Sequence, residues 1–239
     1  MKIDIAFDFR TDSFGKDPDS YSATLRNYHQ LLWSKELPNG ENLILNDNLK
    51  NLSSAGEFRF SSDSIIHTFY KWKRMQEIIK QIPNEEIDDF VKLSYTIGGM
   101  TIFPSNKVEG KKTINGERGL NRKINDRIDL TLECIRRYYL NEESPMTDCL
   151  NGYSEFFNLF CNFKGYIDFF FFQDLVAENY ETIKFLYPFE DFKCNSLPRT
   201  KEEYLKYKDN TMEFINKRNM RIDNWQKKNI NFSSICADV

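Results

Sequence analysis

Aromatic side chains are the feature that most restricts what this chain can fold into. They make up 15% of its 239 residues, with 21 Phe and 12 Tyr. Each ring buries a large apolar area, so this many rings can fill a sizeable core and offset the entropy of ordering the chain. The chain is therefore expected to be globular rather than disordered.

The longest apolar run is too short to cross a membrane. It spans Phe169–Phe172 and is bounded on both sides by polar residues, whereas a membrane-spanning helix needs about 20 apolar residues. The N-terminal segment is interrupted by Asp4 and Asp8 and has no apolar stretch of the signal-peptide kind. We expect a cytoplasmic protein with no membrane partner.

Cysteine usage is typical of a reducing compartment. The five cysteines form no C-x-x-C pair and their number is odd, which disfavours a disulfide framework or a structural zinc site. They are Cys134, Cys149, Cys161, Cys194 and Cys236. All five are predicted to be reduced.

The length and the absence of a repeat or linker fit one domain covering residues 1–239, with loose order expected at residues 1–20 and 229–239. Apolar periodicity and turn residues predict an α+β fold, predominantly helical with a small sheet. Helices are expected over residues 25–33, 64–81, 120–140, 146–160, 166–177 and 198–228, with a short one starting at residue 84. Strands are expected over residues 3–9, 43–45, 57–60 and 93–103, with a strand or apolar loop at 183–187 and a polar loop at 104–119.

Charge is unevenly distributed along the chain. The formal net charge is −3, which argues against a dedicated nucleic-acid binder. Residues 107–137 and residues 199–228 nevertheless each carry nine Lys or Arg against five Asp or Glu. These segments can present a basic face to an anionic partner, or they can pair with the acidic remainder of the chain.

Residues 113–139 hold the strongest candidate for a site. On a helix over residues 120–140, Ile124, Ile128, Leu132 and Ile135 fall on one side. The opposite side is polar and carries Arg122, Asp126, Asp129, Glu133, Arg136 and Arg137. One interpretation is a solvated face stabilised by ion pairs between residues four apart, such as Arg122 with Asp126 and Glu133 with Arg137.

The other interpretation of this segment is a phosphate site with carboxylates beside it. Asn115 and Arg118 precede the predicted helix in a glycine-containing loop, and together with Arg122 and Arg136 they can bind phosphate through amide, guanidinium and helix N-terminal donors. Asp126, Asp129 and Glu133 are spaced so that they line one stripe, where they can act as general bases or bind a divalent metal such as Mg²⁺. The nearby G-K-K-T run at 110–113 is not a P-loop, because the first glycine would fall at Ser105 and Lys112 occupies the Ser/Thr position.

Two histidines complete the candidate residues. His29 and His67 both fall in predicted helices with basic neighbours. An acid and a base of this type would serve a ribonuclease that needs no metal. The alternative is that each is a half-buried or surface histidine without a catalytic role.

Four stretches together resemble a known family. They are LRNYHQLLWSKELPNG, FRFSSDSIIHTF, TINGERGLNRKINDRIDLTLECIRRYY and GYIDFFFFQDLV. They are similar to an uncharacterised family of bacterial proteins of about this length, and the likeness covers most of the chain. The resemblance implies one domain and a bacterial origin, and it implies no activity, cofactor or catalytic residue.

Three functions remain open on these grounds. The first is an enzyme acting on nucleic acid or nucleotide phosphates, such as a ribonuclease-like toxin or defence effector with RNA or a nucleotide as its ligand. The second is a nucleotide-dependent, NAD-type transferase with Arg118 on the pyrophosphate and Glu133 or Asp126 as the acid. The third is a non-enzymatic protein whose aromatic surplus forms a partner-binding or homo-oligomer interface.

Overall fold

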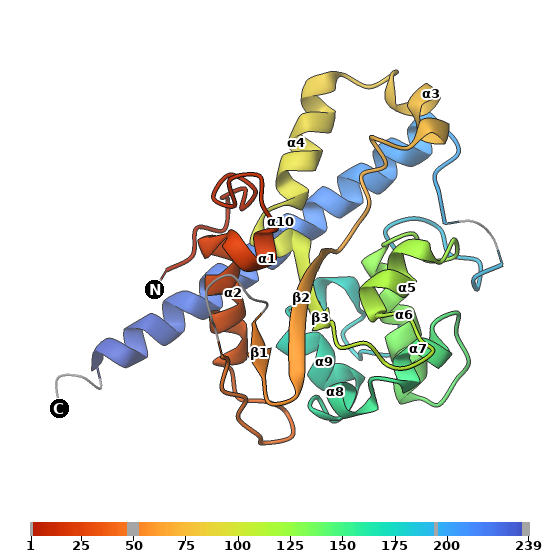
Figure 1. The fold of residues 1–239 in the computed structure, drawn as a ribbon. Coiled ribbons are helices and arrows are strands. Elements are labelled where there is room, and N and C mark those ends of the chain that lie inside the picture. Colours follow the sequence, from red (N-terminus) through yellow and green to blue (C-terminus); the bar gives the residue numbers. More distant parts are fainter. Residues whose placement is uncertain (1, 47–52, 194–195, 236–239) are drawn as a thin grey trace.

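A small antiparallel sheet lies at the centre of a mostly helical fold (Figure 1). The computed structural model describes residues 2–46, 53–193 and 196–235, with side chains described as far as Asn229. The sheet has the order β1 (Ser54–Ala55), β2 (Phe58–Ser64) and β3 (Met100–Pro104). Phe60 pairs with Pro104 and Ser62 with Ile102. The expected α+β class with mostly helical content is confirmed.

The N-terminal helices lie on one side of the sheet (Figure 1). They are α1 (Pro18–Tyr21) and α2 (Ala23–Trp33). The Ser22 hydroxyl accepts a hydrogen bond from the Leu25 backbone N–H at 3.1 Å and so caps α2. Trp33 at the end of α2 stacks on Phe60 of β2 with 4.3 Å between ring centroids, which fixes the helix against the sheet.

The opposite side of the sheet is covered by a group of short helices. They are α5 (Ile114–Leu120), α6 (Ile128–Tyr139), α7 (Thr147–Asn151), α8 (Ser154–Asn158), α9 (Phe163–Phe169) and the 3-10 turn η3 (Gln173–Leu175). The phenylalanine run follows α9, and Phe170 and Phe172 in it are fully buried. These rings contact aromatic residues of α8 and α9, so the predicted aromatic core is confirmed.

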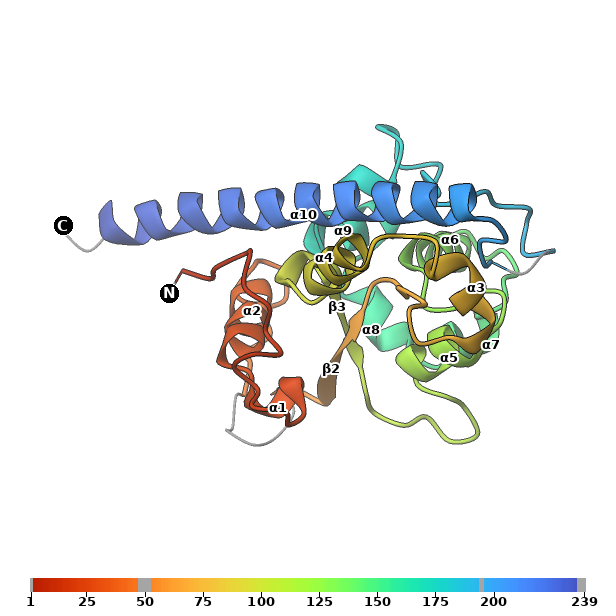
Figure 2. The same cartoon turned by 90° about the horizontal axis from the view of Figure 1, so that it is seen from above.

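The longest helix, α10 (Lys201–Ile235), runs along the whole molecule (Figure 2). It packs against α4 (Asn84–Ser94) and the 3-10 turn η2 (Ile97–Gly99). A Cβ at Gly98 would lie 2.7 Å from the Ile215 carbonyl oxygen, so glycine is what allows this close approach. Within the described part of the chain, no helix, α10 included, combines the length and the apolar character needed to cross a membrane.

A buried arginine ties α10 to three other parts of the core. Arg218 is fully buried, and its guanidinium donates to the carbonyls of Phe170 (3.0 Å), Gly98 (2.9 Å) and Met100 (2.5 Å) and to the Tyr28 hydroxyl (3.0 Å). None of these acceptors is a carboxylate. The charge is therefore held by oriented dipoles alone.

Several expected elements differ from the structure in kind or extent. Residues 3–9 form turns rather than a strand, and the helix expected over 64–81 is reduced to the 3-10 turn η1 (Lys73–Met75) and α3 (Gln76–Ile79). The expected polar loop at 104–119 contains α5, and α10 ends at Ile235 rather than near residue 228. Residues 43–45 and 183–187 form no strand, although Asn46 and Ile183 each make an isolated bridge.

The most consequential error concerns residues 120–140, which are not one helix. Asn125 and Asp126 have φ of 50° and 57°, in the left-handed region that ends a right-handed helix. The Asp126 backbone N–H donates to the Arg118 carbonyl at 3.1 Å, which closes the turn between α5 and α6. Asp126 therefore lies outside the helix that carries Asp129 and Glu133, and the predicted stripe of three carboxylates does not form.

Candidate functional site

Arg118 of α5 and Asp63 of β2 form an ion pair between two elements that are distant in sequence. Arg118 is fully buried, whereas 28% of the Asp63 side chain is exposed. The guanidinium also donates to the Thr131 hydroxyl at 3.1 Å and to the carbonyls of Ser64 and Asp126, each at 3.0 Å. Four of its five N–H donors are thus occupied, so Arg118 positions Asp63 rather than holding a phosphate.

Asn115 lies one turn before Arg118 and faces the same strand. Its amide nitrogen donates to the Ser61 hydroxyl at 3.0 Å. Its amide oxygen is buried and accepts no hydrogen bond in the described structure. Exchanging the two amide atoms would leave the nitrogen unpaired instead, so in either orientation this side chain has one buried polar atom without a partner in the described structure.

Asp19 of α1 binds the open edge of β2. The strand β1 reaches only to Arg59 in its pairing with β2, so the Ser62 N–H has no strand beside it on that side. The Asp19 carboxylate takes this place and accepts the Ser62 N–H at 2.8 Å and 3.0 Å. This contact brings a second carboxylate next to Asp63, which is the following residue of the strand.

His29 of α2 completes the group from the other side. It is 1% exposed, its Nε2 lies 2.8 Å from the Ser62 hydroxyl, and it is 3.8 Å from the Asp19 carboxylate. Burial lowers the pKa of His29 to about 3, helped by the positive charge of Arg26. The imidazole is therefore neutral at physiological pH and serves as a hydrogen-bond partner rather than a general acid.

The carboxyl groups of Asp19 and Asp63 both have a raised pKa. Burial raises the pKa of Asp19 to about 6, against the opposing effect of its hydrogen bonds from Ser62. Burial also raises the pKa of Asp63 to about 6, with Arg118 lowering it and the charge of Asp126 raising it. Both carboxyls can therefore exchange a proton near neutral pH, which ordinary surface aspartates cannot do. We call Asp19, His29, Ser62, Asp63, Asn115 and Arg118 the β2 acid cluster.

Asp126 borders the β2 acid cluster without joining a metal site. Its carboxylate lies against Gly119, where a Cβ would come within 3.2 Å of the carboxylate oxygen. Its charge raises the pKa of Asp63 and partly offsets the effect of burial on His67. The loop glycine that was predicted to admit a ligand is thus approached by a side chain of the protein.

His67 is not the partner of His29 in an acid–base pair. Its two ring nitrogens lie 2.9 Å from the Phe69 backbone N–H and from the Trp72 indole N–H. A neutral imidazole can accept only one of these, and both contacts disfavour the protonated ring. Burial also lowers the pKa of His67. Each histidine is held by partners of its own, and neither is set up to donate a proton.

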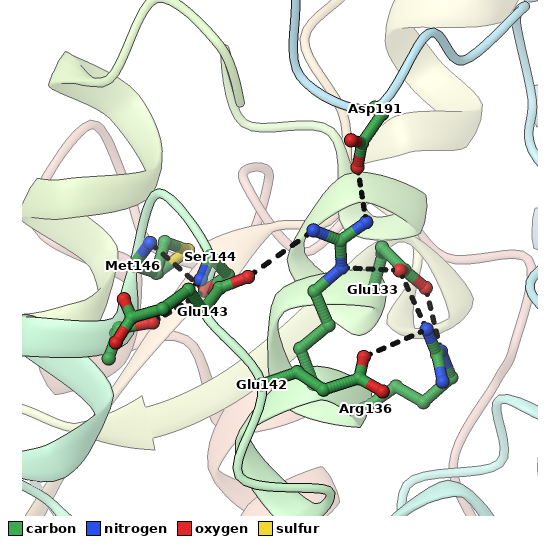
Figure 3. Close-up of polar contacts among 9 residues, drawn as sticks. Glu133, Arg136, Glu142, Glu143, Ser144, Met146 and Asp191 are labelled. Carbon is green, nitrogen blue, oxygen red and sulfur yellow. Dashed lines mark hydrogen bonds and ion pairs between the residues drawn. The ribbon is translucent and has the colours of Figure 1, made fainter.

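Asp129 and Glu133 are both committed to arginines. Asp129 and Arg127 are fully buried and form a two-pronged ion pair, and Asp129 also accepts the Leu186 N–H at 2.9 Å. Glu133 accepts from Arg136 at 2.8 and 2.9 Å and from Arg137 at 2.7 Å (Figure 3).

The nine candidate residues therefore do not form one site. His29, Asn115 and Arg118 all contact β2 and belong to the β2 acid cluster, whereas Asp129 pairs with Arg127, Glu133 pairs with Arg136, and Arg122 is exposed. In the described ranges, no three or more His, Cys, Asp or Glu side chains are arranged to hold a metal. Asp126, Asp129 and Glu133 therefore do not meet as the expected stripe of carboxylates.

Sequence reasoning missed Asp19 and Asp63. Asp63 directly precedes the helix expected over residues 64–81, and Asp19 falls in residues 1–20, where loose order was expected. The sequence did contain an indication of a site here. Aspartate is depleted in strands, so the SSDS run within β2 is unusual for a purely structural strand. The partner on α1 could not be found this way, since it lies 43 residues from Ser62.

The fold and the site define a class of mostly helical α+β proteins with a partly buried carboxylate pair on an open strand edge. The chain belongs to a family of unknown function, DUF6994, whose model matches residues 3–222. The predicted membership of an uncharacterised family covering most of the chain is confirmed. No curated protein and no solved structure matches the chain.

Proposed function

We propose that this protein is an enzyme that acts on phosphodiester or nucleotide substrates by acid–base chemistry at Asp19 and Asp63. RNA is the substrate that we favour. The observation that carries the proposal is that Asp19 binds the Ser62 N–H while Asp63, the next residue of β2, is paired with Arg118, so that each carboxylate is held in place by other groups. A general acid and a general base must both be fixed near the reacting bond, and both need a pKa near the working pH.

The roles of the two carboxyls follow from their partners. Arg118 favours the charged form of Asp63, which makes Asp63 the base, while burial is the main influence on Asp19 and favours its protonated form, which makes it the acid. Asp63 takes the proton of the ribose 2′-hydroxyl, and that oxygen attacks phosphorus. The bond from phosphorus to the 5′-oxygen breaks, and Asp19 gives its proton to the departing oxygen. The products are a cyclic phosphate and a free 5′-hydroxyl.

The charge around α5 supports an anionic substrate. Exposed basic residues flank α5 at both ends: Lys111 and Lys112 before it, Arg122 and Lys123 after it. Such a row of cations attracts a phosphate backbone and makes binding dependent on salt.

The test is cleavage of a fluorescently labelled single-stranded RNA by the full-length protein and by Asp19→Asn and Asp63→Asn. We expect each variant to lose turnover by about 10²–10⁴-fold while still binding RNA. Wild-type turnover should be highest near pH 6, because one carboxyl must be protonated and the other charged. Asp88→Asn, an exposed aspartate of α4, is the matched control and should cleave like wild type.

Melting curves separate loss of chemistry from loss of fold, because Asp63→Asn removes the ion-pair partner of a buried arginine. Asp19→Asn leaves the ion pair of Arg118 intact, so this second variant is less prone to unfold. The proposal fails if wild type cleaves neither RNA nor mononucleotides, or if both variants retain full turnover.

A further inference from the structure

Residues 70–74 form a basic and aromatic surface segment that includes no member of the β2 acid cluster. The segment connects β2 to α3 (Figure 1) and reads Tyr-Lys-Trp-Lys-Arg. Its three cations, at positions 71, 73 and 74, are exposed, and the rings of Tyr70 and Trp72 are half-buried. Cations interleaved with rings are the pattern by which proteins bind a single nucleic-acid strand. We call residues 70–74 the YKWKR segment.

The core holds the YKWKR segment from behind. Two buried tyrosines of α10 donate hydrogen bonds to the backbone just before it. The Tyr204 hydroxyl donates to the Thr68 carbonyl at 2.7 Å, and the Tyr207 hydroxyl donates to the His67 carbonyl at 3.0 Å. The backbone is thus fixed by folding, so little further ordering is needed when a ligand binds.

Trp72 is also held in one orientation. Its indole N–H lies 2.9 Å from Nε2 of His67, and its ring meets the ring of Phe69 edge-on with 5.2 Å between centroids. The guanidinium carbon of Arg74 lies 4.6 Å from the centroid of the Trp72 ring. A ring and a guanidinium are therefore already paired at the surface, and both are groups on which an unpaired base can stack.

The positive charge of the YKWKR segment is not balanced by its neighbours. Residues 65–83 carry four Lys or Arg against one acidic residue, Glu77, which pairs with Lys80 at 2.8 Å. Across the described ranges, none of the three cations of the segment forms an ion pair. Asp126 lies close enough for its charge to act on His67, but one carboxylate against three unpaired cations leaves the surface positive. Such a surface attracts phosphates.

We propose that the YKWKR segment binds single-stranded nucleic acid, with a base stacked on Trp72 and Arg74 and phosphates at Lys71 and Lys73. A single strand is favoured over a duplex, because base faces in a duplex are covered by the neighbouring base pairs. The contacts involve neither carboxylate of the β2 acid cluster. The inference therefore stands whether or not the protein cleaves RNA.

The test uses a fluorescently labelled single-stranded DNA of about ten nucleotides. DNA has no 2′-hydroxyl, so the cleavage reaction proposed above cannot destroy the probe. Anisotropy titration of the full-length protein should show binding at about 50 mM salt that weakens as the salt is raised to about 200 mM. Replacing Lys71 and Lys73 together by Gln should lower the slope of log affinity against log salt by about 0.7 for each phosphate contact removed.

The role of the ring is tested separately. Trp72→Leu should weaken binding by roughly tenfold or more and leave the salt slope unchanged, because it removes stacking and no charge. Trp72→Phe keeps a ring and should bind more tightly than Trp72→Leu. Lys80→Gln removes an exposed lysine outside the YKWKR segment and should bind like wild type. Melting curves confirm that each variant is folded, and the double lysine variant changes only exposed side chains.

Three results would overturn the proposal. The first is no binding of the strand at about 0.1 mM protein in low salt. The second is unchanged binding in folded Trp72→Leu, which would leave no role for the ring. The third is binding of a duplex of the same sequence, or of heparin, as tightly as the single strand. That result would mean that the surface recognises any polyanion.

Discussion

Arg118 was predicted to bind phosphate, and its burial shows why a single residue type is a poor guide to its role. An exposed arginine offers its donors to a ligand, whereas Arg118 gives four of five to the protein. The same holds for Asp129, whose partners Arg127 and Leu186 use both carboxylate oxygens. The sequence identifies such charged residues, but burial and partners decide whether they bind a ligand or stabilise the fold.

Individual titratable residues also determine how the stability of the fold depends on pH. The pKa of His29 is about 3 in the folded protein and about 6.5 in an unfolded chain, so only the unfolded state takes up a proton between these values. Stability from His29 is therefore fully present above pH 6.5 and is lost as the pH falls toward 3. Asp19 and Asp63 act in the opposite direction, because their raised pKa favours the folded state below about pH 4 and this gain is lost as the pH rises through 6.

A variant isolates the histidine contribution. His29→Gln keeps an amide near the Ser62 hydroxyl and cannot be protonated. We expect wild type to lose about 3 kcal/mol more free energy of unfolding than His29→Gln when the pH is lowered from 7 to 4. Urea denaturation at both pH values measures this difference. Equal losses in the two proteins would show that His29 can be protonated in the folded state.

At the scale of elements, the spacing of apolar residues predicted which side chains are buried, but it did not predict where a helix is interrupted. The spacing predicted burial of Ile124, Ile128, Leu132 and Ile135, and all four are fully buried. The same spacing gave no sign of the turn at Asn125 and Asp126, because Ile124 is buried on either path of the chain. What sets the turn is a contact with Arg118, which periodicity within one segment cannot report.

The packing of α6 gives a direct stability prediction. Leu132→Ala removes a fully buried side chain, so we expect the free energy of unfolding to fall by about 2–5 kcal/mol. Leu120→Ala is the matched control, since Leu120 is 70% exposed and its loss should change stability by no more than about 0.5 kcal/mol. Chemical denaturation compares the two. A small loss at Leu132 would contradict the observed register of α6.

At the scale of the whole molecule, the sequence indicated the fold class, the aromatic core and the final helix. It could not indicate the β2 acid cluster, because its residues come from α1, α2, β2 and α5 and meet only when the sheet edge forms. Segment-by-segment reasoning also favoured residues 113–139, where charges are dense. Many of these charged residues form ion pairs with one another in the structure. The local charge pattern therefore suggested more ligand-binding residues than this segment provides.

Replacing Arg218 tests how much the stability of the whole molecule depends on the contacts between α10 and the rest of the core. Arg218→Met leaves three buried carbonyls and the Tyr28 hydroxyl without their donor, so we expect a loss of about 3–5 kcal/mol. Lys217→Met changes an exposed neighbour paired only with Glu213 and should cost no more than about 0.5 kcal/mol. Thermal and urea unfolding measure both. Equal stability of the two variants would mean that water replaces the guanidinium.

The place of this arginine near the end of the chain has a consequence during protein synthesis. The acceptors at Tyr28, Gly98, Met100 and Phe170 leave the ribosome long before Arg218 does. Until α10 emerges, these groups must stay hydrated, and the aromatic core around Phe170 and Phe172 stays open to solvent on that side. The core therefore cannot be completed until α10 has been made, and a ribosome stalled before residue 218 would carry a chain whose aromatic core is still open.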